Sequence, residues 1–248
     1  MQESDRVLVE ILVAAPIETV WRALRDPAEV RRWFGWEYPG LAEEVNMIFG
    51  PENVASDADH TLRFGRMDMA EDRYTLEAQG DHTIVRLIRS APVTDPSWKG
   101  IYDDVSEGWL TFTEELRFVL ERHYHQDRRT LYLNGRAKTV AAPLPAQALG
   151  LDSVIAVPTG HRYATKTTVG EAIEGDVWFR SPFQLGLTVD GYGDGLIIIG
   201  TRPTTDKSPH GGGSVVIMTY GLDDAAFAEL RDRWIAWWSK AYEVIEVQ

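Results

Sequence analysis

Residues 7–40 read VLVEILVAAPIETVWRALRDPAEVRRWFGWEYPG, and this stretch decides the fold. Val7, Val9, Ile11 and Val13 alternate with mixed residues, which predicts a strand with one apolar face. Pro16 has no N–H to offer a sheet, and its fixed φ suits the first turn of a helix. We therefore expect the strand to end just before Pro16 and a helix to begin there.

Apolar side chains then recur at helical spacing: Val20, Trp21, Leu24, Val30 and Trp33. This spacing places them on one face of a helix. Asp26-Pro27 interrupts the pattern, because a residue before proline avoids helical conformation, and a break or kink is expected there. A run of aromatic residues follows: Trp33, Phe34, Trp36 and Tyr38.

This opening resembles that of the START-like (helix-grip) superfamily. The residues that carry the resemblance are Ala15-Pro16, Val20-Trp21, Leu24, Asp26-Pro27 and Trp33. Gly108-Trp109, followed by Leu116 and Leu120, resembles the closing helix of the same superfamily. Within it, the chain is most similar to the branch related to the activator of the heat-shock-protein-ninety ATPase, which includes polyketide cyclase-like proteins. The resemblance covers roughly the first half of the chain and is specific for fold more than for function.

Strands are expected at residues 60–66, 73–79 and 82–89, after a short amphipathic helix at residues 41–49. Gly80-Asp81 joins the last two strands as a two-residue hairpin turn. Alternation predicts an apolar inner face made of Leu62, Phe64, Tyr74, Leu76, Val85 and Leu87. Ser106 is expected to cap a long helix that covers this face. Residues 1–127 thus predict a near-complete, shortened helix-grip domain.

The second half resembles a degenerate copy of the first. VAAPI at residues 13–17 recurs as VAAPL at residues 140–144, and ELR at residues 115–117 recurs at residues 229–231. Further strands are expected at residues 162–168, 174–180, 184–189, 196–201 and 214–220. A final helix follows, capped by Asp223 or Asp224, and its apolar stripe runs from Phe227 to Ile245. No Val-Trp pair or Asp-Pro follows Pro143, so the opening helices of this copy should be short. We expect an α+β chain of two helix-grip domains, residues 1–127 and 128–248, each an antiparallel sheet covered by a long C-terminal helix.

Composition excludes several classes of partner. A formal net charge of −13 argues against nucleic acid and anionic membranes, because phosphate contacts need a basic face. The chain has no cysteine, which excludes disulfides, thiolate catalysis and cysteine metal sites. No basic segment followed by an apolar core opens the chain, and no apolar run is long enough to span a bilayer. We expect a cytoplasmic protein with no nucleic-acid or membrane partner.

The resemblance implies a ligand cavity between the sheet and the covering helix. The residues expected to line it are Trp33, Trp36, Phe64, Tyr74, Phe112 and Leu116. The alternative is that the same side chains only fill the core. Because an aromatic-lined layer with few polar groups suits binding more than bond making, we expect a non-catalytic protein that binds a small hydrophobic ligand.

Two other functions stay open by resemblance. A cyclase- or aromatase-like enzyme acting on an apolar substrate would need polar groups such as Arg63, Tyr74 or Glu77 to point into an open cavity. A co-chaperone-like protein-interaction module is also implied by the family name, but the acidic chain offers no obvious site for it.

No catalytic residue, metal ligand or cofactor is expected. The six histidines lack metal-ligand spacing, and no G-x-S-x-G nucleophile motif occurs. Trp237 and Trp238 are neighbours on the final helix, so one of them should face away from its own domain. That side chain would contact the first domain or a second copy of the chain, and we expect a homodimer through the second domain.

Overall fold

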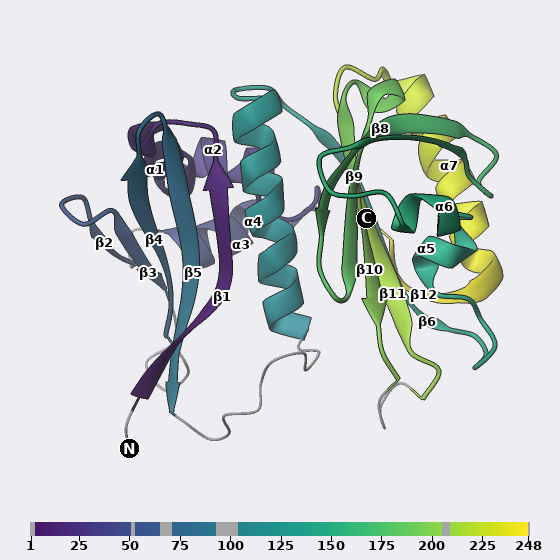
Figure 1. Cartoon of the computed structure of the whole chain (residues 1–248), viewed down its shortest axis with the longest axis horizontal. Coiled ribbons are helices and arrows are strands. Elements are labelled where there is room, and N and C mark those ends of the chain that lie inside the picture. Colours follow the sequence, from purple (N-terminus) through teal and green to yellow (C-terminus); the bar gives the residue numbers. More distant parts are fainter. Residues whose placement is uncertain (1–2, 51–52, 65–70, 93–103, 205–208, 248) are drawn as a thin grey trace. The chain divides into compact units, whose positions relative to one another are not determined.

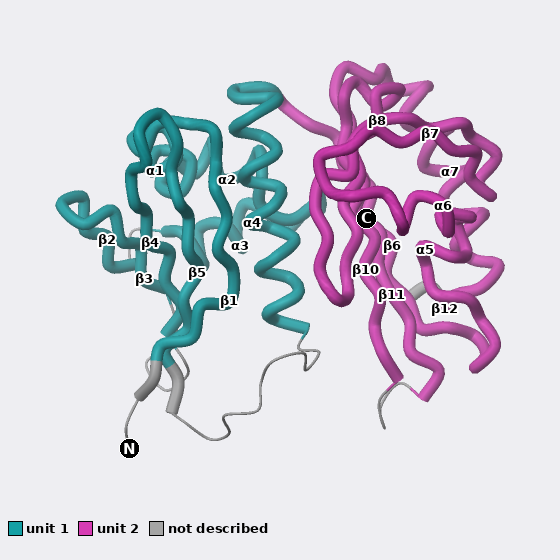
Figure 2. The backbone as a smooth tube through the Cα atoms, in the orientation of Figure 1, with its two compact units in different colours: residues 1–126 teal, residues 127–248 magenta. Residues whose placement is uncertain are grey.

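The computed structural model describes residues 3–50, 53–64, 71–92, 104–204 and 209–247. The chain divides into two compact units, residues 1–126 and 127–248 (Figure 1 and Figure 2). This division lies one residue from the boundary expected from the sequence. Each unit is built on an antiparallel sheet of its own.

A five-stranded sheet frames unit 1, in the order β1-β5-β4-β3-β2. Its strands are β1 (Glu3–Val13), β2 (Val54–Ser56), β3 (Thr61–Phe64), β4 (Glu71–Gln79) and β5 (His82–Pro92). Gln79 pairs with His82 across the predicted two-residue turn, where Gly80 has a φ of +66°. All six side chains expected on the inner face are buried. The short β2, which pairs with β3, was not expected, because its sequence is polar and turn-like.

β1 departs from strict alternation at one point. A bulge between Val7 and Val9 shifts the register, so that Val7 pairs with Ile88 and Val9 with Leu87. An extra residue in one strand turns the side chains on one side of it to the opposite face of the sheet. Val7 is consequently 51% exposed while Val9 and Val13 are buried, and the prediction of an inward Val7 is wrong.

Three helices follow β1: α1 (Ile17–Arg25), α2 (Pro27–Trp33) and α3 (Leu41–Phe49). Asp26 separates the first two, and its carboxylate accepts a hydrogen bond from the amide of Ala28 at 2.9 Å. Pro27 occupies the first turn of α2, where its missing N–H is not needed. The break predicted at Asp26-Pro27 is therefore confirmed, and its physical form is an N-cap.

The long helix α4 (Asp104–Arg122) covers the inner face of the sheet and contacts β1 along its length (Figure 1). Thr113 of α4 forms a hydrogen bond with Tyr74 of β4 at 2.9 Å, which places the middle of the helix over the middle of the sheet. Ser106 does not cap the helix, as the sequence suggested, but lies inside its first turn, because the helix begins two residues earlier.

Unit 2 contains a seven-stranded sheet in the order β12-β6-β11-β10-β9-β8-β7. The strands are β6 (Arg129–Ala137), β7 (Arg162–Lys166), β8 (Ala172–Arg180), β9 (Gln184–Val189), β10 (Gly195–Arg202), β11 (Gly212–Thr219) and β12 (Tyr242–Val247). β12 corrects the sequence analysis, which extended the last helix to Ile245. The alternating Val, Ile and Glu residues of this segment pair with β6 as an edge strand instead.

The helices of unit 2 are α5 (Pro145–Ala148), α6 (Asp152–Ile155), the 3-10 turn η1 (Asp190–Tyr192) and α7 (Asp224–Ala241). α5 and α6 are single turns, which confirms the prediction that this copy has short opening helices. Asp223 caps α7 by accepting a hydrogen bond from the amide of Ala226 at 2.8 Å. Of the two capping candidates, Asp223 is therefore the one used.

The tryptophans of α7 all belong to the core of unit 2. Trp237 is 7% exposed and donates its indole N–H to the hydroxyl of Thr168 at 2.9 Å. Trp238 is fully buried and stacks on Tyr242 with ring centroids 4.2 Å apart. The expectation that one of these tryptophans faces away from its domain is wrong, because neighbouring side chains on α7 pack against different parts of the same core. They provide no surface for a second copy.

The predicted fold class is confirmed: the chain is α+β, and each unit combines an antiparallel sheet with a long C-terminal helix. Within the described part of the chain, none of the helices combines the length and the apolar character that crossing a membrane requires.

Two glycine substitutions should test this packing with opposite signs. A Cβ at Gly135 of β6 would lie 2.0 Å from the carbonyl oxygen of Glu243, so Gly135→Ala should destabilise the protein by about 3 kcal/mol. A Cβ at Gly108 of α4 meets nothing within 4 Å, so Gly108→Ala should stabilise the helix by about 0.5–1 kcal/mol. Urea unfolding of both variants measures these shifts; a Gly135→Ala protein as stable as wild type would contradict the close approach of β12 to β6.

Candidate functional site

The functional candidates of unit 1 gather where its helices meet the inner face of the sheet. Side chains from α2, α3, α4, β3 and β4, and from the segment after α2, bring aromatic rings into mutual contact there. We call this set the aromatic layer. Its members are Trp33, Phe34, Trp36, Phe49, Phe64, Tyr74, Trp109 and Phe112.

The rings form a continuous series. The centroid of Phe64 lies 5.0 Å from that of Trp109, which lies 6.0 Å from Phe112. Phe112 in turn lies 4.6 Å from Phe34, and Phe34 lies 5.1 Å from Phe49. These distances are typical of tilted and edge-to-face aromatic pairs, which are favourable beyond the area that they bury. The layer thus holds α2, α3 and α4 on the sheet of unit 1.

All six residues predicted to line a ligand site lie in this layer or beside it. Four of them are buried: Trp33, Phe64, Tyr74 and Leu116. The other two, Trp36 and Phe112, are half-buried and contact each other with centroids 6.2 Å apart. The layer therefore reaches the surface at this pair. An open cavity behind the pair stays a prediction.

Sequence reasoning did not assign Phe34, Phe49 and Trp109 to the site. Phe49 contacts Trp33 and Phe64, and Phe34 contacts Phe112. Helical spacing indicated that Phe49 and Trp109 are on apolar faces, but it does not show which element a face meets. Phe34 lay within the aromatic run that attracted attention, so its position in the run was the one available signal.

Polar groups within the layer are bonded to the protein itself. The hydroxyls of Tyr74 and Thr113 form a hydrogen bond, and Thr113 also donates to the carbonyl oxygen of Trp109 at 2.7 Å. The indole N–H of Trp33 donates to the carbonyl oxygen of Ala23 at 2.9 Å. Burial raises the pKa of Tyr74 well above its usual value, so its phenol stays protonated at neutral pH. These groups stabilise the layer, and none is poised to accept a proton.

The other polar candidates for catalysis face the opposite way. Arg63 is exposed and pairs with Glu71 at 3.1 Å. Glu77 is 60% exposed and pairs with Arg86 at 2.7 Å across the β4–β5 hairpin. On an exposed face such pairs contribute about 1 kcal/mol at most. Of the three groups that a cyclase-like enzyme would direct inward, only Tyr74 points toward the helix-covered side of the sheet.

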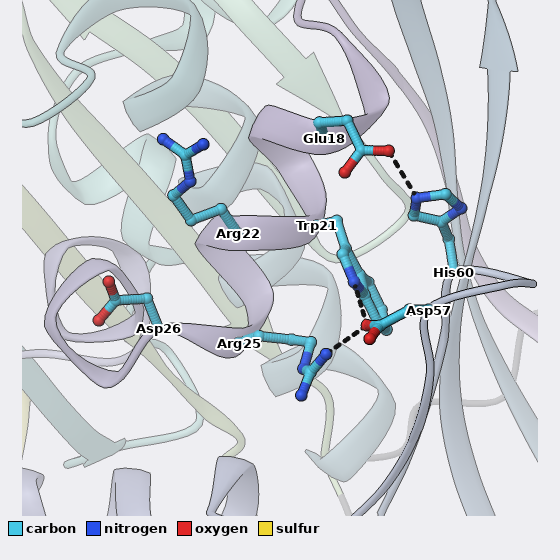
Figure 3. A pocket seen from close by; sticks show the side chains of 7 residues that line it. All are labelled: Glu18, Trp21, Arg22, Arg25, Asp26, Asp57 and His60. Atoms are coloured by element: carbon cyan, nitrogen blue, oxygen red, sulfur yellow. Dashed lines mark hydrogen bonds and ion pairs between the residues drawn. The ribbon is translucent and has the colours of Figure 1, made fainter.

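A surface cleft of about 580 Å³ lies between α1 and the turn that leads into β3 (Figure 3). Its lining residues are Glu18, Trp21, Arg22, Arg25, Asp26, Asp57 and His60. The carboxylate of Asp57 accepts hydrogen bonds from the indole N–H of Trp21, at 2.9 Å, and from the guanidinium of Arg25. Arg25 also lies over the Trp21 ring at 5.2 Å. The cleft was not foreseen, because its residues come from two segments that are far apart in the sequence.

His60 closes one side of this cleft. Its Nε2 lies 3.1 Å from Glu18, and its ring meets the Trp21 ring edge-on with centroids 5.5 Å apart. Its side chain is 20% exposed, because its ring packs against Trp21. The backbone of His60 adopts a φ of +44°, which is uncommon for a residue with a side chain. Because Asp57 and His60 are each bonded to α1, we interpret the cluster as a tie between α1 and the β2–β3 turn.

A second polar cluster lies in unit 2, between α7 and the sheet. Glu171 accepts hydrogen bonds from the hydroxyl of Tyr192 and from Arg233 at 2.9 Å, and Trp234 donates to the Tyr192 oxygen at 3.1 Å. Burial, together with the neighbouring Glu171 carboxylate, raises the pKa of Tyr192. Every member has a partner, so the cluster stabilises the attachment of α7.

The residues that the structure describes include no group of three or more His, Asp or Glu side chains that could hold a metal ion. His123 forms a hydrogen bond with Gln126 at 3.0 Å, and His125 lies 2.8 Å from Glu29. These two histidines therefore have separate partners and form no ligand pair.

Comparison with known proteins gives several similar solved structures. No protein-family model matches the chain, and no curated protein matches it. DynU16, a protein of the dynemicin biosynthetic locus, is 18% identical over 96% of each chain, with a TM-score of 0.33. BexL, a di-domain ARO/CYC protein of the BE-7585A biosynthetic pathway, is 14% identical and covers 97% of this chain and 96% of its own, with a TM-score of 0.31.

Aha1 from Colwellia psychrerythraea, solved as a dimer, is similar to half of the chain. It is 18% identical, covers 50% of this chain and 99% of its own, and has a TM-score of 0.33. TM-scores of 0.31 to 0.33 support no statement about ligand, reaction or assembly. What the chain binds must be inferred from its own geometry.

Raising the pH should destabilise the protein above about pH 10, the ordinary pKa of tyrosine. The pKa values of Tyr74 and Tyr192 are higher in the folded protein than in the unfolded chain. The stability that these two phenols contribute is therefore complete below about pH 10 and is lost as the pH rises toward their pKa values in the folded protein. Urea midpoints between about pH 8 and pH 11 measure the loss. Tyr74→Phe should cost about 1 kcal/mol at neutral pH and make the alkaline decline shallower. Equal declines for variant and wild type would contradict the raised pKa of Tyr74.

Proposed function

We propose that unit 1 binds a small apolar ligand, without catalysing a reaction, where the aromatic layer reaches the surface at Trp36 and Phe112. The observation that supports this most is the continuity between that half-buried pair and the buried rings behind it. Phe112 contacts Trp36 on the outer side, and Phe34 and Trp109 on the inner side. A ligand placed there gains about 25 cal/mol for each Å² of apolar surface removed from water.

The apolar character of the ligand follows from the state of the polar groups. Tyr74, Thr113 and Trp33 already have hydrogen-bond partners inside the protein. A polar ligand group buried against the layer would lose its water without gaining a partner, at a cost of about 1–3 kcal/mol. The layer therefore selects for ligands whose contacting surface is hydrocarbon or aromatic.

Binding is better supported than catalysis. Of Arg63, Tyr74 and Glu77, the three groups that a cyclase-like reaction would direct inward, only Tyr74 lies on the covered side of the sheet, and its phenol is held protonated by burial. General acid–base chemistry needs a group whose pKa lies near the working pH. No contact among the described residues favours a co-chaperone-like interaction over ligand binding.

Phe112→Ala tests the proposed site. Titration of the full-length protein with Nile red, a neutral apolar dye, should show fluorescence enhancement for the wild type and about tenfold weaker binding for the variant, since the loss of one ring contact is worth about 1.4 kcal/mol. Native mass spectrometry of the purified protein would show whether an apolar molecule co-purifies with it, and Phe112→Ala should reduce its occupancy.

Phe183→Ala is the matched control, because it removes a half-buried phenyl ring from unit 2. Far-UV circular dichroism and urea midpoints would show that both variants are folded. If dye binding is absent in the wild type, or falls equally in the two variants, the aromatic layer is not the binding site.

A further inference from the structure

A stretch of unit 2 differs in charge from the rest of the chain. Residues 139–160 read TVAAPLPAQALGLDSVIAVPTG, and Asp152 is the only charged residue among these 22. In the whole chain, 25% of residues are charged. The segment links β6 to β7 and contains α5 and α6. A connection on the protein surface is normally polar, so this composition calls for a reason.

Burial within unit 2 does not supply that reason. Pro145, Leu149, Leu151 and Val154 are buried and anchor the segment to the core. Val140, Leu144 and Ile155 are instead 77%, 49% and 40% exposed. They make up three of the eight large apolar side chains that are exposed in the described part of the chain. We call the surface that carries them, residues 139–160, the uncharged face.

The uncharged face is held in a fixed conformation. The hydroxyl of Tyr242 donates to the carbonyl oxygen of Pro143, and Thr168 donates to that of Ala148 at 2.6 Å. Arg180 donates to the carbonyl oxygen of Val157 at 3.0 Å. α5 and α6 also contact each other. A surface that is already ordered loses little conformational entropy on binding, which favours a specific contact.

We propose that the uncharged face is the surface through which two copies of this chain associate. At a net charge of −13, two copies repel each other over most orientations. A two-fold contact places the same patch of both copies face to face, so a charged patch would meet its own sign. Residues 139–160 carry a single charge and so avoid this repulsion. That charge is Asp152, and Arg180 is bonded to the segment at the carbonyl oxygen of Val157, so a two-fold contact can pair these opposite charges.

Other occupants fit these observations less well. An anionic membrane would repel the acidic chain. Depletion of charged residues, with an apolar centre and a polar rim, is the composition of interface cores between identical chains. This proposal is independent of ligand binding by unit 1, and it places the self-association of unit 2 on a different surface from its tryptophans.

Sedimentation of the full-length protein across a concentration series tests the proposal. The wild type should show a monomer–dimer equilibrium with a dissociation constant of about 1–100 µM. Leu144→Glu with Ile155→Glu should raise that constant at least tenfold. Leu144→Lys with Ile155→Lys should do the same, although it lowers the net negative charge, because any charge at the centre of the face must be desolvated.

Met47→Glu with Val54→Glu is the control, since it adds the same charge at exposed apolar positions of unit 1, 68% and 66% exposed. It should leave the dissociation constant within about twofold, and added salt should strengthen wild-type association by screening the net charge. A wild type that stays monomeric up to about 1 mM overturns the proposal. So does a dimer that the control disrupts as strongly as the two face variants, or one unaffected by all of them.

Discussion

The carbonyl oxygen of Ala15 accepts a hydrogen bond from the hydroxyl of Thr83 at 2.8 Å, and Thr83 is fully buried. One residue earlier, the amide of Ala14 donates to the carboxylate of Glu121 at 2.9 Å. These two bonds fix the corner at which β1 ends and α1 begins, and they tie it to β5 and to the last turn of α4. Because the sheet, the first helix and the covering helix all meet there, the aromatic layer between them depends on this corner.

The same corner explains why so much of unit 1 could be predicted. Its constraints are local: a strand with period two, a proline without an N–H and a helical stripe of apolar residues. Each of them can be recognised from the residue types in one short segment. The predictions that were wrong depend on non-local geometry. Val7 is exposed because β5 tolerates a bulge opposite it, and Ile245 lies in a strand because β6 offers an unpaired edge. Neither partner can be identified from the segment alone.

In the candidate site, too, the local features could be predicted and the contacts between distant segments could not. Alternation on β3 and β4 correctly placed Phe64 and Tyr74 on the covered face, and helical spacing correctly placed Leu116. Spacing alone could not bring Phe49 against Phe64, because that contact depends on how α3 crosses the sheet. Nor could it foresee the position of His60, whose positive φ turns the imidazole toward Trp21. A side chain's direction depends on backbone conformation, which composition and spacing do not specify.

The two units fill the space beneath their long helices in different ways, and the difference favours unit 1 as the site of the proposed ligand. In unit 2, Glu171, Tyr192 and Trp234 are joined by directional hydrogen bonds. Separating them would leave a mostly buried carboxylate with fewer partners, which is costly. In unit 1, Phe112 is held by ring contacts to Trp36, Phe34 and Trp109, which are individually weak and tolerate small rearrangements. Moving Phe112 to admit a ligand therefore costs less than opening the core beneath α7, even though unit 2 buries its three neighbouring tryptophans there.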